Sequence, residues 1–258
     1  MLQIPKRIKI FCCALIFLLF NPYLAHCATL RDMYESATDL YNKGQYDESI
    51  EMYKQIVKTV PQFAPAYIGL GLALKAKGAD IEEVLYYYNT AVDKDPTNSQ
   101  ALEQLGRLYY SIGKLDKAKV SFEKVLKINP NVPTVKQSLG WICLVGKNAN
   151  PRRAIAYFLD VLKTSPNANT YFGLGIAYFS DNQREKTLDV ITQLKDMGED
   201  GFAGKLEKAV RENHKVILDN PEDNSENQES NPKQDTFEKT SDTPKGMKVR
   251  LRGKLDQL

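Results

Sequence analysis

The side chains that most often carry out catalysis are scarce in this sequence. Its 258 residues include two histidines, His26 and His214. We expect His26 to leave with an export signal at the N-terminus, which would leave His214 alone. A single histidine cannot form a catalytic dyad or triad, or a multi-histidine metal site. The sequence therefore predicts no catalytic centre of this kind, no metal and no cofactor.

Two glycine motifs and several paired carboxylates are the other candidates for chemistry. Gly69–Gly71 and Gly173–Gly175 both read G-x-G. A phosphate-binding loop joins a strand to a helix, whereas these glycines recur inside helical patterns, so we interpret them as packing positions. Asp47-Glu48 and Glu82-Glu83 stand at predicted helix starts, where carboxylates complement the helix dipole without any catalytic role.

The elements that would position any site come from an internal repeat. A Leu-Gly pair recurs every 34 or 35 residues, at Leu70-Gly71, Leu105-Gly106, Leu139-Gly140 and Leu174-Gly175. Each unit pairs a small residue with a bulky one 16 to 18 residues later: Ala37 with Tyr53, Gly71 with Tyr88, Gly106 with Phe122, Gly140 with Phe158, and Gly175 with Ile191. A proline closes four of the units, at Pro61, Pro96, Pro130 and Pro166.

Apolar residues within each unit return at helical spacing in two runs with a break between them. The third unit shows both runs most clearly, as Leu102, Leu105 and Tyr109, then Ala118, Phe122 and Val125. One unit is therefore predicted to be a hairpin of two helices, A and B. Small residues on helix A allow close approach, and the aromatic ring from helix B fills the gap. This pattern resembles the tetratricopeptide repeat.

The resemblance implies an all-α fold, a right-handed superhelical solenoid of five helix-turn-helix repeats within residues 28–200. We place the repeats at about residues 30–63, 64–98, 99–132, 133–167 and 168–200. Apolar spacing from Phe202 to Ile217 predicts a capping helix over residues 201–218. Residues 219–258 hold few large apolar side chains, which predicts a disordered tail with a basic end.

The N-terminus has the order of an export signal over residues 1–27. Three basic residues precede an apolar run from Ile10 to Phe20, which is shorter than the roughly 20 residues that a membrane-spanning helix needs. Leu24–Cys27 resembles a bacterial lipoprotein box and would place a lipid on Cys27. Two alternatives stay open: simple cleavage near Cys27, and an uncleaved anchor that holds the protein to the membrane.

The end of the tail has a pattern of its own. Met247, Val249 and Leu251 alternate with basic residues, and this period of two suits a short strand. Such a strand could join the sheet edge of another protein or lie on an anionic surface; a solvated tail with chance alternation is the alternative. The formal net charge of the chain is +3, which is too small to predict a nucleic-acid partner.

The resemblance also implies where a partner would bind, because tetratricopeptide arrays hold ligands on a concave side lined by three positions of each helix A. We call these the inner-face positions. They map to Tyr34, Thr38 and Tyr41; Ile68, Leu72 and Lys75; Glu103, Arg107 and Tyr110; Gln137, Trp141 and Leu144; and Phe172, Ile176 and Phe179. As partner-binding residues we select Tyr34, Tyr41, Leu72, Arg107, Tyr110, Trp141, Leu144, Phe172, Ile176 and Phe179.

The last two sets of inner-face positions are largely apolar. Trp141 is the only tryptophan in the chain and lies outside the tryptophan column of the family, so we expect an exposed apolar anchor around it. The alternative is that the cap or tail of the chain itself fills this end. The Lys/Asn clamp of chaperone-type domains is missing, which argues against a carboxylate-terminated chaperone tail as the ligand.

These observations predict a non-enzymatic scaffold that binds an extended or helical peptide of another protein. We expect it in the bacterial cell envelope, tethered to a membrane and facing the periplasm or exterior, where it would assist assembly of a complex. A glycan or small-molecule binder is the alternative, with Tyr34, Tyr41, Tyr110 and Trp141 as stacking platforms. A hydrolase or transferase would have to use Glu103 and Arg107.

Overall fold

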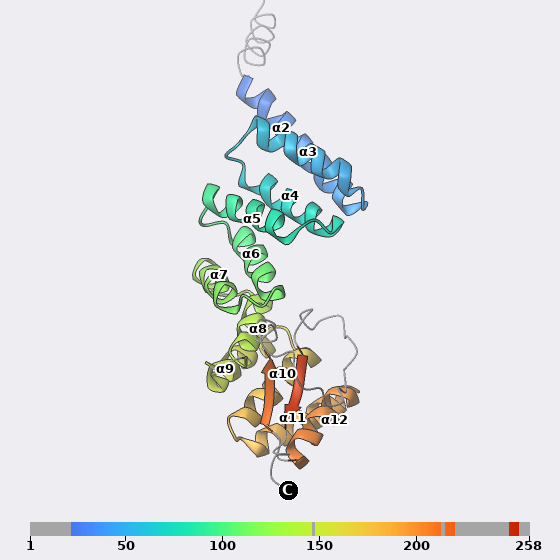
Figure 1. Ribbon diagram of the computed structural model, residues 1–258, viewed down its shortest axis with the longest axis vertical. Helices are drawn as coiled ribbons and strands as arrows, with labels where there is room; N and C mark the ends of the chain where they lie inside the picture. Colours follow the sequence, from blue (N-terminus) through green and yellow to red (C-terminus); the bar gives the residue numbers. More distant parts are fainter. Residues whose placement is uncertain (1–21, 146–147, 213–214, 220–247, 253–258) are drawn as a thin grey trace, which may run out of the picture. The chain divides into compact units, whose positions relative to one another are not determined.

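The computed structural model describes residues 22–145, 148–212, 215–219 and 248–252, with the backbone alone for residues 22–28 and for the last two ranges (Figure 1). The helices are α2 (Pro22–Asn42), α3 (Tyr46–Thr59), α4 (Ala64–Lys77), α5 (Ile81–Lys94), α6 (Ser99–Ser111), α7 (Leu115–Ile128), α8 (Pro133–Ile142), α9 (Pro151–Leu162), α10 (Ala168–Ser180), α11 (Arg184–Asp196) and α12 (Asp200–Glu212). The strands are β1 (Lys215–Asp219) and β2 (Lys248–Arg252).

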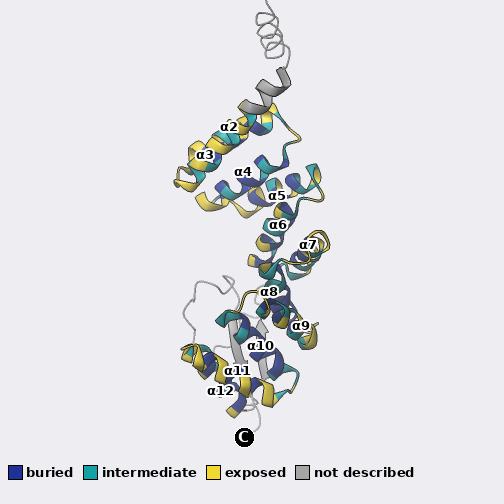
Figure 2. Ribbon diagram, turned by 180° about the vertical axis from the view of Figure 1, so that it is seen from behind, coloured by how far each residue is buried: buried dark blue, intermediate teal, exposed yellow. Residues whose placement is uncertain are grey.

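Each predicted repeat is a helical hairpin in the structure. The five pairs are α2 with α3, α4 with α5, α6 with α7, α8 with α9 and α10 with α11. All four closing prolines lie between a helix B and the next helix A, where the missing N–H and the fixed φ do not interrupt a helix. The A helices α4 and α10 are largely buried, whereas α3 and α11 carry exposed residues along one side (Figure 2).

The pairing of small and bulky residues is confirmed in the second, third and fourth repeats, whereas Gly175 in the fifth lies against Leu206 and Val190 and not against Ile191. A Cβ atom added to Gly71 would lie 2.5 Å from the Tyr88 ring, and one added to Gly106 would lie 2.7 Å from Phe122. The five bulky residues of the column are all buried. Gly173, half of the second G-x-G motif, lies against Phe158 in the same way, so these glycines are packing positions as predicted.

The turns between helices A and B use the left-handed backbone conformation. Gly78 ends α4 with φ 86°, a value that glycine adopts without steric penalty. Asn182 takes the equivalent place after α10 with φ 58°, and asparagine is among the few other residues that tolerate it. The chain reverses at both places and begins helix B within a few residues.

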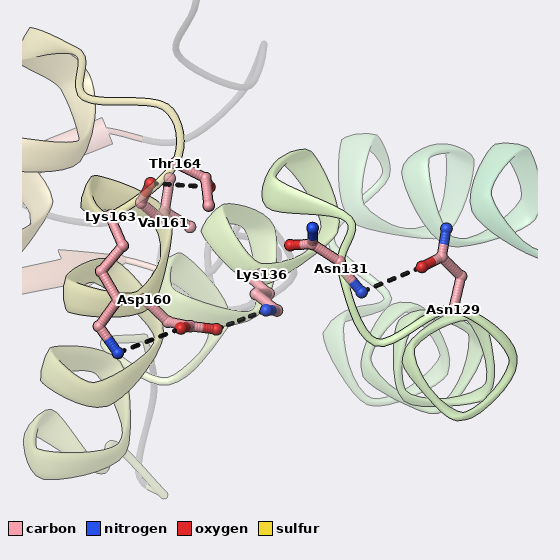
Figure 3. A network of polar contacts seen from close by, with 7 residues as sticks. All are labelled: Asn129, Asn131, Lys136, Asp160, Val161, Lys163 and Thr164. Atoms are coloured by element: carbon pink, nitrogen blue, oxygen red, sulfur yellow. Dashed lines mark hydrogen bonds and ion pairs between the residues drawn. The ribbon is translucent and has the colours of Figure 1, made fainter.

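A polar contact also joins the helices of the fourth repeat. The Lys136 ammonium on α8 donates to the Asp160 carboxylate on α9, and Lys163 contacts the same carboxylate at 3.5 Å (Figure 3). The hydrogen bond from Lys136 lowers the pKa of Asp160 below its usual value. The pair therefore ties helix A to helix B at the edge of the apolar packing.

Contacts between residues divide the chain into two compact units, Met1–Ala101 and Leu102–Leu258, which we call unit 1 and unit 2. In unit 1 a buried cluster of Ile68, Ala91 and Ala101 is packed against Leu72 and two other partly buried residues. In unit 2 the buried residues run from α6 to α12. Each unit is described by itself below.

The C-terminal part differs from the prediction. The capping helix exists, but α12 ends at Glu212 instead of residue 218, and the next described segment is a strand. The run Lys215–Asp219 contains Val216, Ile217 and Leu218, and β-branched residues favour strands over helices. β1 pairs antiparallel with β2, from Lys215 opposite Arg252 to Asp219 opposite Lys248.

The alternation near the C-terminus therefore does form a strand, but its partner is β1 of the same chain. The remainder of the predicted tail, residues 220–247 and 253–258, lies outside the described residues. So does most of the predicted signal, residues 1–21. None of the helices in the described ranges is both long and apolar enough to cross a membrane.

Candidate peptide-binding surface

The first set of inner-face positions lies on α2, in unit 1, and is partly exposed. The Tyr34 ring packs edge-on against Tyr53 and Phe63, at centroid distances of 5.8 and 5.4 Å. The Thr38 hydroxyl is 3.0 Å from the Tyr53 hydroxyl. Burial raises the pKa of both Tyr34 and Tyr53. These contacts hold Tyr34 and Thr38 in place, and both side chains remain partly accessible to solvent.

Further inner-face side chains of unit 1 are also accessible. Tyr41 is partly exposed and lies at a tilt to Tyr46, with 5.7 Å between the ring centroids. On α4, Ile68 is buried in the core cluster, whereas Leu72 is partly exposed and Lys75 is exposed. Unit 1 therefore presents Tyr34, Tyr41 and Leu72 as the prediction requires.

The inner-face side chains of α6, in unit 2, differ in their exposure to solvent. Arg107 is exposed, and its Nε lies 3.9 Å from a carboxylate oxygen of Glu103. Tyr110 is buried, and burial raises the pKa of its hydroxyl well above the usual value. Only Arg107 of the two predicted binding residues on α6 is thus open to a partner.

The expected exposed anchor around Trp141 is not present in the structure. Trp141 and Phe172 are each 3% exposed, and Leu144 and Ile176 are buried as well. The Trp141 ring lies 5.5 Å from Phe158 and 6.3 Å from Phe172. Phe179 alone among these predicted anchors is partly exposed.

The chain itself covers this end, as the alternative in the sequence analysis allowed. Phe202 of α12 stacks on Phe172, with 4.6 Å between ring centroids and 23° between ring planes. The Lys205 ammonium lies 5.8 Å from the Phe172 ring and 5.3 Å from the Phe202 ring, within cation–π range. β1 also contacts α10.

Burial also bears on the glycan alternative. Tyr110 and Trp141 are buried, so their ring faces are not open to a sugar. Tyr34 is already stacked edge-on against two rings. The structure therefore offers no set of open aromatic platforms at these four predicted positions.

Groups that could hold a metal are not brought together either. Within the part of the chain that the structure describes, no cluster of three or more His, Cys, Asp or Glu residues has metal-binding geometry. Cys143 is a buried free thiol, and burial raises its pKa, which disfavours the reactive thiolate.

The environment of one polar atom near the covered end could not be predicted from the sequence. The Trp141 Nε1 atom is buried and has no hydrogen-bond partner among the described residues. The sequence showed that Trp141 stands outside the usual tryptophan column, but not that it would be enclosed. Its ring lies against Phe158 and Phe172, and Phe172 is in turn stacked by Phe202 of α12.

Comparison with known proteins agrees with the repeat architecture. Sequence profiles of the tetratricopeptide repeat match residues 34–99 and 99–132. Protein CTR9 homolog of Arabidopsis thaliana is 29% identical over 116 residues, which are 42% of this chain and 10% of that protein. Hsp70-Hsp90 organizing protein 1 of Glycine max is 29% identical over 112 residues, 43% of this chain and 18% of that protein. The matches thus span a small part of these longer relatives.

Solved structures show the same fold. YrrB, described as a tetratricopeptide repeat protein with an unusual peptide-binding site, superposes with a TM-score of 0.61 at 17% identity, covering 68% of this chain and 90% of YrrB. A tetratricopeptide repeat protein from Parabacteroides merdae gives a TM-score of 0.60 at 18% identity, covering 71% and 72%. The hairpins, their glycine and aromatic columns and these matches together show that the chain belongs to the tetratricopeptide repeat proteins, a family of mostly non-enzymatic scaffolds for protein–protein interaction.

Proposed function

We propose that this protein is a scaffold of the bacterial cell envelope that binds a peptide segment of another protein on its inner face. The observation that carries the proposal is the partial exposure of Tyr34, Tyr41 and Leu72 in unit 1. These side chains stand at the ligand positions of the family, and packing of the hairpins does not enclose them. Tyrosine is among the residue types that contribute most of the binding energy at protein interfaces, and burial of Leu72 under a ligand would add hydrophobic stabilisation.

A capture experiment with matched variants tests this proposal. The immobilised full chain is compared with Leu72→Glu and with Tyr86→Glu, whose parent residue is 63% exposed on helix B of the same repeat. A charge at residue 72 would have to be desolvated under an apolar ligand. A specific partner should be lost with Leu72→Glu and kept with Tyr86→Glu; equal capture by all three proteins would contradict the proposal.

We also propose that a lipid on Cys27 tethers the protein to the membrane. α2 has 21 residues, whereas the A helices α4, α6 and α10 have 14, 13 and 13. Cleavage before Cys27 would leave residues 27–42 of α2, close to the length of the other A helices, with the lipid on the first residue of the helix. Labelling with palmitate should mark the wild type and the Cys143→Ser control but not Cys27→Ser. Equal labelling of all three, or of none, would reject the lipid.

The scaffold proposal includes no catalysis by this chain. The support is the isolated position of His214 in the mature sequence and the surface location of the Glu103 and Arg107 pair. Turnover of any substrate that Glu103→Ala abolishes would overturn this part of the proposal.

A further inference from the structure

Equivalent inner-face positions differ in the two units. Leu72 follows Gly71 on α4, and Ile176 follows Gly175 on α10, so the two residues share one place in the repeat. Leu72 is partly exposed, whereas Ile176 is 1% exposed. Both helices are followed by a helix B of the same hairpin. The hairpin alone therefore does not explain why the inner face is closed at α10.

Unit 2 contains two additional elements beside α10. One is α12, which contributes Phe202 over Phe172 and places Leu206 next to Gly175. The other is the strand pair, in which β1 contacts α10 and β2 pairs with β1. Figure 1 shows both strands beside α10. The covering material thus comes from residues that follow the last repeat in the sequence.

A polar group at the covered end of unit 2 is buried without a partner in the described part of the chain. The Trp141 Nε1–H donor is buried without an acceptor among the described residues. A buried donor without a partner destabilises the state that contains it. A segment that places a carbonyl oxygen near this donor would therefore fit the face better than the present cover does.

We propose that the β1–β2 strand pair is a resident occupant of the inner face of unit 2, which a partner peptide displaces. In the resting chain the strand pair shields Trp141, Ile176 and their neighbours. An extended partner peptide replaces it and supplies a backbone carbonyl to Trp141 Nε1. The displacement rests on the proposed function, whereas the occupancy by the strand pair does not and can be tested without any partner.

Fluorescence of the full chain tests the occupancy, because Trp141 is the only tryptophan. Alternate residues of an antiparallel strand exchange hydrogen bonds with the partner strand, so proline at two consecutive positions removes at least one of them. The test variants are V249P/R250P in β2 and V216P/I217P in β1. Gln257→Pro, beyond β2, is the matched control.

The wild type and Gln257→Pro should emit at short wavelength and be quenched weakly by acrylamide. In both double-proline variants the emission should shift to longer wavelength, and the quenching constant should rise severalfold, while the far-UV circular dichroism of the helices is retained. A shielded Trp141 in both double variants would overturn the proposal, because the helices alone would then bury it. Amide exchange in Lys215–Asp219 as fast as in an unstructured peptide would overturn it as well.

The fluorescence test of the occupancy and the capture test of the proposed function can fail independently of each other. If Trp141 becomes accessible in the double variants but no specific partner is captured, the occupancy stands and the proposed function fails. If a partner depends on Leu72 while Trp141 stays shielded in both variants, the proposed function stands and the occupancy fails.

Discussion

A glycine of helix A lies against an aromatic ring of helix B in the second, third and fourth hairpins, which makes a single methyl group costly there. In Gly106→Ala the new Cβ would lie 2.7 Å from the Phe122 ring. Overpacking of this kind destabilises a core by about 1–3 kcal/mol. We therefore expect urea unfolding of Gly106→Ala to show a lower free energy of unfolding by that amount.

Gly204→Ala is the matched control, since Gly204 lies in α12 with no atom within 4 Å of the added Cβ. Alanine is the better helix former, so this variant should gain about 0.5–1 kcal/mol. Equal effects at residues 106 and 204 would show that close packing does not select glycine in the repeat column.

Two buried tyrosines of unit 1 should respond in opposite directions to loss of the hydroxyl. Burial raises the pKa of Tyr88, whose hydroxyl has no hydrogen-bond partner among the described residues. Tyr88→Phe should thus stabilise the protein by about 1 kcal/mol, because an unsatisfied buried group is removed. Tyr53→Phe should cost about 0.5–1.5 kcal/mol, because it loses the contact with Thr38 at 3.0 Å. Thermal unfolding of both variants measures the signs, and destabilisation by Tyr88→Phe would contradict this assignment.

The glycine and aromatic columns were predictable because their spacing repeats in the sequence. The unsatisfied hydroxyl of Tyr88 and the enclosed indole of Trp141 were not. Their environments depend on neighbours far apart in the sequence, and repetition says nothing about whether an acceptor lies nearby.

At the scale of elements, α12 closes the stack of hairpins in unit 2. Leu206 is 1% exposed and lies beside Gly175. Leu206→Ala should cost about 2–5 kcal/mol. Because repeats are stabilised mainly by their neighbours, hydrogen exchange should accelerate most in α10 and α11. Lys208→Ala on the exposed side of α12 should leave exchange unchanged, and uniform acceleration along the chain by Leu206→Ala would contradict the capping role.

The ion pair between α8 and α9 predicts a dependence on pH. Lys136 lowers the pKa of Asp160, so the folded state binds this proton more weakly than the unfolded state does. The stabilisation is therefore fully present above the unfolded pKa of about 4 and is lost as the pH falls from there through the lower pKa of the folded state. Since Asp160 is partly exposed, water screens the pair and its contribution is about 0.2–1 kcal/mol.

Asp160→Asn should accordingly lower the melting temperature slightly at pH 7, and the difference from the wild type should shrink steadily as the pH falls below about 4. Lys136→Met should show the same dependence on pH. A difference that persists undiminished at pH 3 would mean that packing, and not charge, is responsible.

The hairpins were predicted more accurately than the elements that follow them. The hairpins followed from apolar spacing, closing prolines and the turn residues between the helices. The end of α12 was placed six residues too late, since Phe202 to Ile217 can be read at helical spacing, whereas Lys215–Asp219 forms a strand with Lys248–Arg252. The alternation at Val249 and Leu251 predicted a strand there, but not its partner, because pairing between segments this far apart in the sequence has no local signal.

At the scale of the whole molecule, one repeat pattern supports two kinds of surface. Unit 1 keeps Tyr34, Tyr41 and Leu72 accessible, whereas unit 2 encloses Trp141, Phe172 and Ile176. The resemblance placed all of these at ligand positions, but it could not predict that the segments after the last repeat would cover some of them. The surface that we propose for peptide binding is therefore the one in unit 1, where these side chains are accessible.

Crosslinking in living cells tests that claim most directly. A photoreactive amino acid replaces Leu72 in one strain and Tyr86, on the exposed side of α5, in another. We expect a discrete adduct with a second protein from residue 72 and none from residue 86. Adducts from residue 86 alone, or adducts from residue 72 that contain only this chain, would contradict it.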